Sequence, residues 1–181
     1  MDGGLTDTKP PMFPMFISLN RRGVLVVGAG AVALRKADIL LRCGALLRVV
    51  SPSVTSGFDS VHGVERVEFS RRAYSASDMT EPLGCGIKIS MAIAATDDRS
   101  VNHLVWLDAA RLGLPVNVAD CPDECAFFFP SFVEHDGFVA GISSSGRSPS
   151  QCRRLANRLR SRWKTWVSDT AGKDDNTGGA N

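Results

Sequence analysis

Gly28, Gly30 and Ala33 have the spacing at which small residues of a chain can hold a pyrophosphate. They directly follow an apolar run of strand length, residues 23–27, and a helical pattern begins at Ala31. In such a strand–turn–helix the first glycine permits the tight turn and the second lets a pyrophosphate approach the backbone. The third small residue allows helix and strand to pack closely. Because the free N–H groups and positive dipole end of the helix would face the phosphates, the pattern predicts a nucleotide site.

The acidic residue that normally completes this pattern is missing. A second strand should end about 20 residues further on in Asp or Glu, which holds the ribose hydroxyls of NAD. The matching apolar run ends instead in Ser51, followed by Pro52 and Ser53. The pattern therefore leaves NAD, NADP and S-adenosylmethionine open as ligands.

The elements that must position these residues alternate between strand and helix. Helices are predicted over residues 31–42 and from a cap at Asp97 or Asp98 to about Leu112. Strands are predicted at residues 23–27, 46–51, 64–69, 87–95 and 116–120. This alternation predicts an α/β fold, a Rossmann-type parallel sheet with right-handed connections. The carboxyl ends of its strands would bring Gly28, Ser51, Thr96 and Asp120 to one edge.

The pattern changes after Asp120. Two apolar runs, residues 127–134 and 138–143, flank His135-Asp136-Gly137 and predict a β-hairpin. A helix with an apolar stripe from Cys152 to Val167 follows. Since hairpin and stripe are too apolar for so small a segment, we expect them to pack in a homodimer. The domains expected are a Rossmann domain over 1–129, a dimerisation and helical segment over 130–168, and a disordered tail over 169–181, with residues 12–19 extended along the sheet edge.

Composition excludes several classes of function. The net charge of +2 and the absence of a long apolar run argue against a nucleic-acid or membrane partner. Five cysteines, which form no even framework, and the lack of a signal peptide indicate the reducing cytoplasm. One Cys-x-x-x-Cys, at Cys121 and Cys125, is poor zinc spacing, so no metal site is predicted. Seven basic side chains lie between Arg147 and Lys164 with no acidic one, which fits a solvated face or a carboxylate-binding face better than a nucleic-acid site.

Several further motifs occur in a defined order along the chain. They are Phe13-Pro14-Met15-Phe16, the glycine loop with Arg35-Lys36, Ala94-Ala95-Thr96-Asp97-Asp98 with Asn102, Asn117-Val118-Ala119-Asp120, Phe127-Phe128-Phe129-Pro130-Ser131 and Ile142 to Pro149. In this order they resemble the precorrin-2 dehydrogenase domain of the siroheme synthase family, over roughly Met12 to Trp166.

The resemblance implies oxidation of precorrin-2, a tetrapyrrole, to sirohydrochlorin with NAD. It implies that Asp120 is catalytic, that Asn117, Ser144 and Arg147 bind the substrate, and that Ser144 matches a serine phosphorylated in some members. The implied cofactor residues are Gly28, Gly30, Ala31 and Val32 at the pyrophosphate, Ser51, Pro52 and Ser53 on the adenosine side, and Thr96 near the nicotinamide ribose.

The chemistry of the reaction gives Asp120 a role. Loss of a hydride must be accompanied by loss of a proton, and a carboxylate beside the cofactor site can act as the general base. Without the resemblance, the favoured interpretation of Asp120 is a helix cap or a turn residue before Pro122. Because no second helix follows the basic one, we expect weak or absent insertion of iron. Two other functions stay open: a redox-sensing regulatory module without catalysis, and a methyltransferase.

Overall fold

The computed structural model describes residues 12–58, 61 and 64–171, with side chains to residue 168. It forms two compact units, Ile17–Phe129 and a second in which residues 12–16 join residues 130–171. The tails predicted to be disordered fall outside the described residues, apart from positions 169–171.

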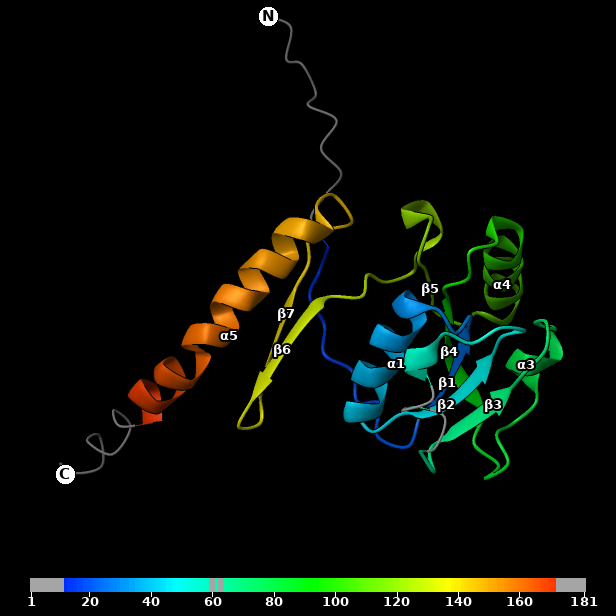
Figure 1. Ribbon diagram of the computed structural model, residues 1–181, viewed down its shortest axis with the longest axis horizontal. Helices are drawn as coiled ribbons and strands as arrows, with labels where there is room; N and C mark the ends of the chain where they lie inside the picture. The colour runs from blue at the N-terminus through cyan, green and yellow to red at the C-terminus, as the bar shows by residue number, and fades with distance from the viewer. Residues whose placement is uncertain (1–11, 59–60, 62–63, 172–181) are drawn as a thin grey trace, which may run out of the picture. The chain divides into compact units, whose positions relative to one another are not determined.

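The first unit is built on a five-stranded parallel sheet with the order β3-β2-β1-β4-β5, which confirms the predicted α/β class (Figure 1). The strands are β1 (Gly23–Val27), β2 (Leu46–Val50), β3 (Val67–Ser70), β4 (Ile89–Ala94) and β5 (Val116–Val118). All five residues of β1 are buried, because helices cover both faces of the sheet.

One face of the sheet packs against α1 (Ala31–Arg42), which buries Ala33, Ala37 and Leu40 on Val24, Val26 and Val49. The other face packs against α3 (Ser77–Thr80) and α4 (Arg99–Leu112). Asp98 caps α4 by accepting hydrogen bonds from the N–H groups of Ser100 and Val101, and Gly113 ends the helix with φ 65°. Both long helices thus begin at the carboxyl edge of the sheet, as their sequence patterns predict.

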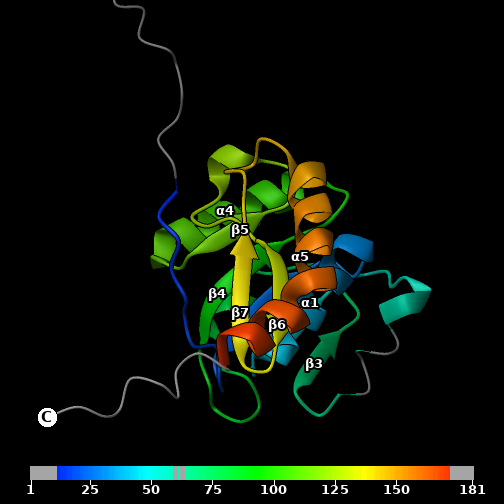
Figure 2. The same ribbon diagram turned by 90° about the vertical axis from the view of Figure 1, so that its left-hand side faces the viewer.

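The second unit contains β6 (Ser131–His135), β7 (Phe138–Ile142) and α5 (Pro149–Ala171). The two strands are antiparallel, and Asp136 and Gly137 have φ of 48° and 79°, as a type I′ turn requires. Helix α5 lies along the hairpin and buries Cys152 and Ala156 (Figure 2). Among the described residues, no helix is long and apolar enough to span a bilayer.

Several predicted boundaries were wrong, among them those of β3 (64–69 expected), β4 (87–95 expected) and β5 (116–120 expected). Strand β6 begins at Ser131 because Phe127 and Phe129 pack on the core of the first unit instead. Residues 12–19 form no strand of either described sheet, and their position along the sheet edge stays a prediction. Helix α5 continues past Ser168 to Ala171, since its backbone needs no apolar side chain to extend by a turn.

Candidate functional site

The strand registers align the carboxyl ends of four strands at one edge of the first unit. Val27 lies opposite Val50 on one side and Ala94 on the other, and Ala94 lies opposite Val118. Strand order reverses between β1 and β4, and ligands bind in α/β sheets at such a switch point. The predicted residues Gly28, Ser51, Thr96 and Asp120 therefore all follow strands that end at this edge.

Gly28 and Gly30 meet different surroundings. Gly28 has φ +106°, and a Cβ on it would lie 2.2 Å from the carbonyl oxygen of Ala95. Gly28 is thus required by the fold itself. A Cβ on Gly30 would meet nothing within 4 Å, and φ there is −83°. No packing explains Gly30, so the open space beside its backbone fits the approach of a pyrophosphate.

The N-terminus of α1 is also free of competing groups. Gly30 is its N-cap, and among the described residues no side chain caps this end and no acid occupies the first turn. Ala31 and Val32 are exposed there. The first N–H groups of the helix can therefore donate to an anion.

The loop after β2 is tied to the glycine loop by Thr55. Its N–H and hydroxyl both donate to the carbonyl of Ala29, at 3.2 and 3.0 Å. Ser51 is buried, and its hydroxyl donates to the carbonyl of Ser53 at 2.6 Å. Pro52 and Ser53 are exposed. The adenosine contacts of Pro52 and Ser53 stay a prediction, while the hydroxyl of Ser51 holds their turn.

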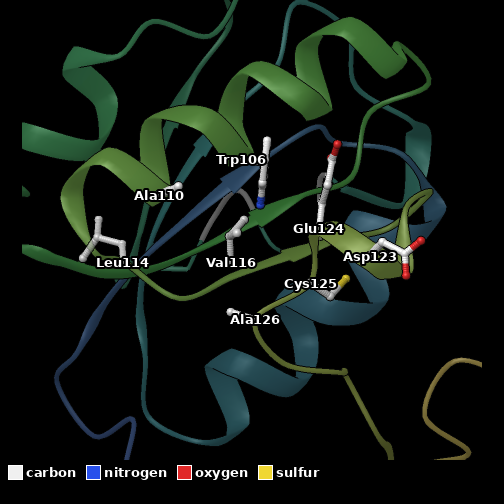
Figure 3. A pocket seen from close by; sticks show the side chains of 8 residues that line it. All are labelled: Trp106, Ala110, Leu114, Val116, Asp123, Glu124, Cys125 and Ala126. Carbon is white, nitrogen blue, oxygen red and sulfur yellow. The ribbon is translucent and has the colours of Figure 1, made fainter. Parts of the chain in front are cut away.

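A pocket of about 230 Å³ lies elsewhere in the first unit, between α4 and the segment after β5 (Figure 3). None of the predicted cofactor residues lines it. Its lining consists of Trp106, Ala110, Leu114, Val116, Asp123, Glu124, Cys125 and Ala126. It lies on the outer side of the edge strand β5, so it is separate from the glycine-loop edge.

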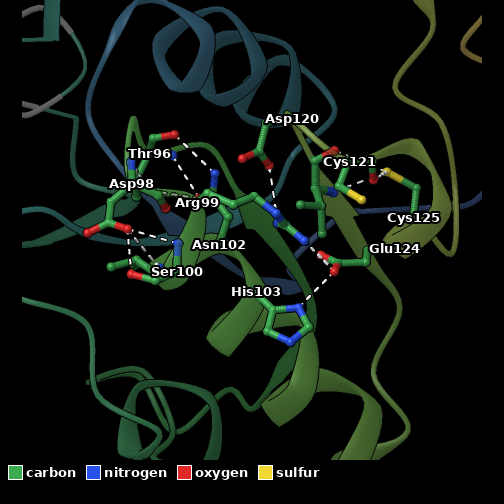
Figure 4. Close-up of polar contacts among 12 residues, drawn as sticks. Thr96, Asp98, Arg99, Ser100, Asn102, His103, Asp120, Cys121, Glu124 and Cys125 are labelled. Atoms are coloured by element: carbon green, nitrogen blue, oxygen red, sulfur yellow. Dashed lines mark hydrogen bonds and ion pairs between the residues drawn. The ribbon is translucent and has the colours of Figure 1, made fainter.

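Thr96 is held by the fully buried side chain of Asn102 (Figure 4). Asn102 Oδ1 accepts from the N–H and the hydroxyl of Thr96 at 3.0 and 2.8 Å, and its Nδ2 donates to the Thr96 carbonyl at 3.0 Å. Asn102 therefore holds the turn at the end of β4 in one conformation.

Asp120 is exposed and lies in a chain of charged side chains (Figure 4). Its carboxylate is 3.5 Å from Arg99 Nη1, and Arg99 also donates to Glu124. His103 Nδ1 lies 2.7 Å from the same Glu124 oxygen. The hydrogen bond from Arg99 lowers the pKa of Glu124, which keeps this carboxyl ionised. Arg99 is thus fixed at its far end and can orient Asp120.

Asn117, predicted to bind the substrate, is buried beneath this edge. Its Oδ1 accepts from Lys36 Nζ and its Nδ2 donates to the Phe127 carbonyl at 2.9 Å. Lys36 lies 5.6 Å from the centre of the Phe129 ring. Burial lowers the pKa of Lys36 to about 8. The described contacts of Asn117 are internal, and its role toward a substrate stays a prediction.

Ser144 and Arg147 belong to the second unit. The Ser144 hydroxyl accepts from the N–H of Ser148 at 2.7 Å, and its carbonyl accepts from Arg147 Nε at 3.2 Å. Both residues therefore shape the turn that leads into α5. The basic side chains of α5 are exposed: Arg153, Arg154, Arg158, Arg160, Arg162 and Lys164.

All five cysteines are free thiols. Cys125 Sγ contacts the N–H and carbonyl of Val118 at 3.2 and 3.1 Å. Burial raises the pKa of the Cys125 thiol, so it stays protonated and is a poor metal ligand. Within the described ranges, no three His, Cys, Asp or Glu side chains form a metal-binding group.

Sequence reasoning gave no role to Arg99, Lys36 or Asn102. A signal existed for Lys36, which falls on the apolar stripe of α1, three residues after Ala33 and four before Leu40. A lysine on a core-facing stripe must bury its charge or find a partner. No sequence pattern pairs Arg99 with Asp120, because these residues meet only through the fold.

The sequence profile of a family described as "Putative NAD(P)-binding" matches residues 15–131. The chain is 40% identical to siroheme synthase from Psychrobacter arcticus over 161 residues, which is 89% of the chain but 27% of that protein. It is 37% identical to siroheme synthase from Ectopseudomonas mendocina over 165 residues, 91% of the chain and 33% of that protein. The chain thus spans a third or less of the length of these relatives. Among solved structures, SirC, a precorrin-2 dehydrogenase, has a similar fold, with a TM-score of 0.67, 23% identity, and coverage of 87% of this chain and 76% of SirC.

Proposed function

The chain belongs to the NAD(P)-binding family whose profile spans residues 15–131, and on this premise we propose that it is a precorrin-2 dehydrogenase. It would oxidise precorrin-2 to sirohydrochlorin with NAD, as a step of siroheme biosynthesis. Similarity to siroheme synthases over 89% of the chain and the shared fold with SirC support this proposal.

One observation carries the proposal: the same sheet edge has a helix N-terminus with open space at Gly30 and an exposed carboxylate at Asp120. The first feature suits a dinucleotide and the second suits removal of a proton. A redox-sensing module would need only the first.

The residues present fit a bound dinucleotide. Gly28, Gly30, Ala31 and Val32 would hold the pyrophosphate, Pro52 and Ser53 the adenosine, and Thr96 the nicotinamide ribose. When bound, the nicotinamide ring supplies a hydride acceptor. The protein contributes the anion-binding N–H groups of α1 and a turn at Thr96 that Asn102 keeps rigid.

Asp120 is proposed as the general base. Oxidation of the substrate releases one hydride and one proton, and the proton would pass to a carboxylate oxygen of Asp120. Arg99 orients this carboxylate from one side and leaves it exposed.

The proposed substrate residues are Asn117, Ser144 and Arg147. The exposed arginines of α5 can bind carboxylates of the tetrapyrrole in bidentate fashion.

We propose that the protein is cytoplasmic, because its five cysteines are free thiols, as expected in a reducing compartment. We also propose that it is a homodimer formed through the second unit. The proposed partners include neither nucleic acid nor membrane. Iron insertion is proposed to be weak or absent, because Asp120 is exposed and a macrocycle must be shielded from water while two pyrrole protons leave.

The test is an anaerobic assay of the purified chain with precorrin-2 and NAD, following sirohydrochlorin by absorbance. Asp120→Asn should lower turnover by about 10²–10⁴-fold, the usual contribution of a general base, and leave NADH binding intact. Asp123→Asn, a change of equal charge on an exposed neighbouring turn, serves as the control. NADH binding without turnover in the wild-type chain would favour the redox-sensing module instead.

A second assay measures iron insertion. Ferrous iron is added to sirohydrochlorin under the same anaerobic conditions, and a rate of siroheme formation well above the spontaneous one would contradict the proposal of weak or absent iron insertion.

A further inference from the structure

We propose that this chain uses NADP as well as NAD, with Arg71 and Ser53 recognising the 2′-phosphate of NADP. The inference rests on the proposed dinucleotide site but not on the identity of the substrate. It concerns the adenosine-ribose end of the site, where sequence alone left the choice of cofactor open.

The first argument is the chemistry at the end of β2. An acidic residue here binds the ribose hydroxyls of NAD and repels a 2′-phosphate, whereas an arginine nearby accommodates that phosphate. The position is occupied by Ser51, which is buried and whose hydroxyl is already bonded to the carbonyl of Ser53. Pro52 and Ser53 follow, and neither is acidic. Among residues 51–58, all of them described, no acidic side chain therefore selects against a phosphate.

The second argument is the position of Arg71. Strand β3 pairs with β2 in the register Val50 to Ser70, and the N–H of Ser51 donates to the Ser70 carbonyl at 3.1 Å. Arg71 directly follows Ser70, so its backbone is level with Ser51 one strand away, about 5 Å across the sheet. An arginine side chain is long enough to cross that gap. Arg71 thus stands where the arginine of an NADP site is needed.

The third argument is that Arg71 is available and its neighbour is not. Arg72 is held by Asp78, with Nη1 to Oδ2 at 2.9 Å and Nη2 to Oδ1 at 2.5 Å, and it also donates to the carbonyl of Ala73. Arg71 is exposed and has no hydrogen-bond or ion-pair partner among the residues with described positions. A free guanidinium matches phosphate in a bidentate geometry. The exposed hydroxyl of Ser53 can add a second donor from the loop after β2.

The experiment is equilibrium binding of NADH and NADPH to the full chain, followed by nicotinamide fluorescence at fixed pH and salt, with no tetrapyrrole present. Wild-type protein should bind the two nucleotides with dissociation constants within about tenfold of each other. Arg71→Gln should weaken NADPH binding by about 10–100-fold, the value of a charge-assisted contact, and NADH binding by less than about twofold. Ser53→Asp should also weaken NADPH selectively, because it restores a carboxylate near the ribose.

Arg22→Gln is the matched control. Arg22 is an exposed arginine that precedes β1, at the opposite edge of the sheet, so its loss changes net charge equally. It should affect neither nucleotide by more than about twofold. Binding of NADH without NADPH, or an equal loss of both in Arg71→Gln, would overturn this inference and leave the proposed function standing. Failure to bind either nucleotide would overturn both.

Discussion

At the scale of single residues, the glycine loop separates a requirement of folding from a requirement of binding. Gly28 has a backbone conformation that L side chains avoid, and its missing Cβ leaves room for the Ala95 carbonyl. Gly30 has an ordinary φ and open space around it. We therefore propose two physical reasons for the same residue type, the fold at Gly28 and dinucleotide binding at Gly30, which single substitutions can tell apart.

Gly28→Ala should lower the free energy of unfolding by about 2 kcal/mol or more, from a strained φ and steric overlap. Gly30→Ala should change it by less than about 1 kcal/mol. It should nevertheless weaken NADH binding at least about tenfold, because the methyl group occupies the pyrophosphate approach. Urea denaturation and calorimetric titration measure the two effects. Normal NADH binding by Gly30→Ala would contradict the assignment of that space to the cofactor.

Lys36 should produce a pH dependence of stability. Its pKa falls from the ordinary 10.5 to about 8 in the folded chain because burial disfavours the charged form. Between these two values the unfolded chain binds more protons, so the free energy of unfolding rises with pH. The rise should be about 2–3 kcal/mol between pH 7 and 10.

The control for this effect is Lys36→Met, which lacks the titrating group and keeps most of the side-chain volume. Other groups titrate in both proteins, so the difference between the two denaturation curves isolates Lys36. Parallel stability profiles from pH 7 to 10 would show that Lys36 is not desolvated.

At the scale of elements, the turn between β4 and α4 depends on one buried side chain. Asn102, in the first turn of α4, bonds the N–H, hydroxyl and carbonyl of Thr96. The start of α4 and the end of β4 are thereby held together, and Thr96 lies at the sheet edge that is proposed to bind the cofactor. We call these hydrogen bonds between Asn102 and Thr96 the Asn102 clamp. Asn102 fixes the position of Thr96 and is not itself one of the proposed cofactor residues.

Asn102→Ala should cost about 2 kcal/mol of unfolding free energy, since it leaves partly buried groups of Thr96 unpaired. Asn157→Ala on α5 is the control. Asn157 is exposed and bonds Arg160, so its loss should cost less than about 0.5 kcal/mol. Equal midpoints in urea for the two variants would rule out the clamp.

At the scale of the whole molecule, the second unit offers apolar surface that it cannot bury alone. One helix covers one face of a two-stranded sheet, and Phe138, Leu155 and Trp166 are 56%, 55% and 50% exposed. In the proposed homodimer, a second copy of the chain covers this surface.

Sedimentation equilibrium at micromolar concentration should therefore give twice the chain mass. Phe138→Asp combined with Leu155→Asp should shift the protein to monomer, because each charge would be buried in the interface. Leu104→Asp is the control, since Leu104 is 44% exposed on α4 of the first unit and should leave the mass unchanged. A wild-type monomer would contradict the dimer.

The sequence by itself determined what depends on local periodicity and on special backbone geometry. The strand–turn–helix around Gly28, the cap at Asp98 and the hairpin turn at Asp136 could be predicted because each involves neighbours in the chain. The gathering of strand ends at one edge also followed, since parallel strands with helical crossovers allow few arrangements. Only the tertiary structure decided which side chains far apart in the sequence contact each other. It buried Asn117 against Lys36, joined Arg99 to Asp120, and moved the start of β6 to Ser131. These outcomes depend on packing between residues far apart in sequence, for which local patterns carry no information.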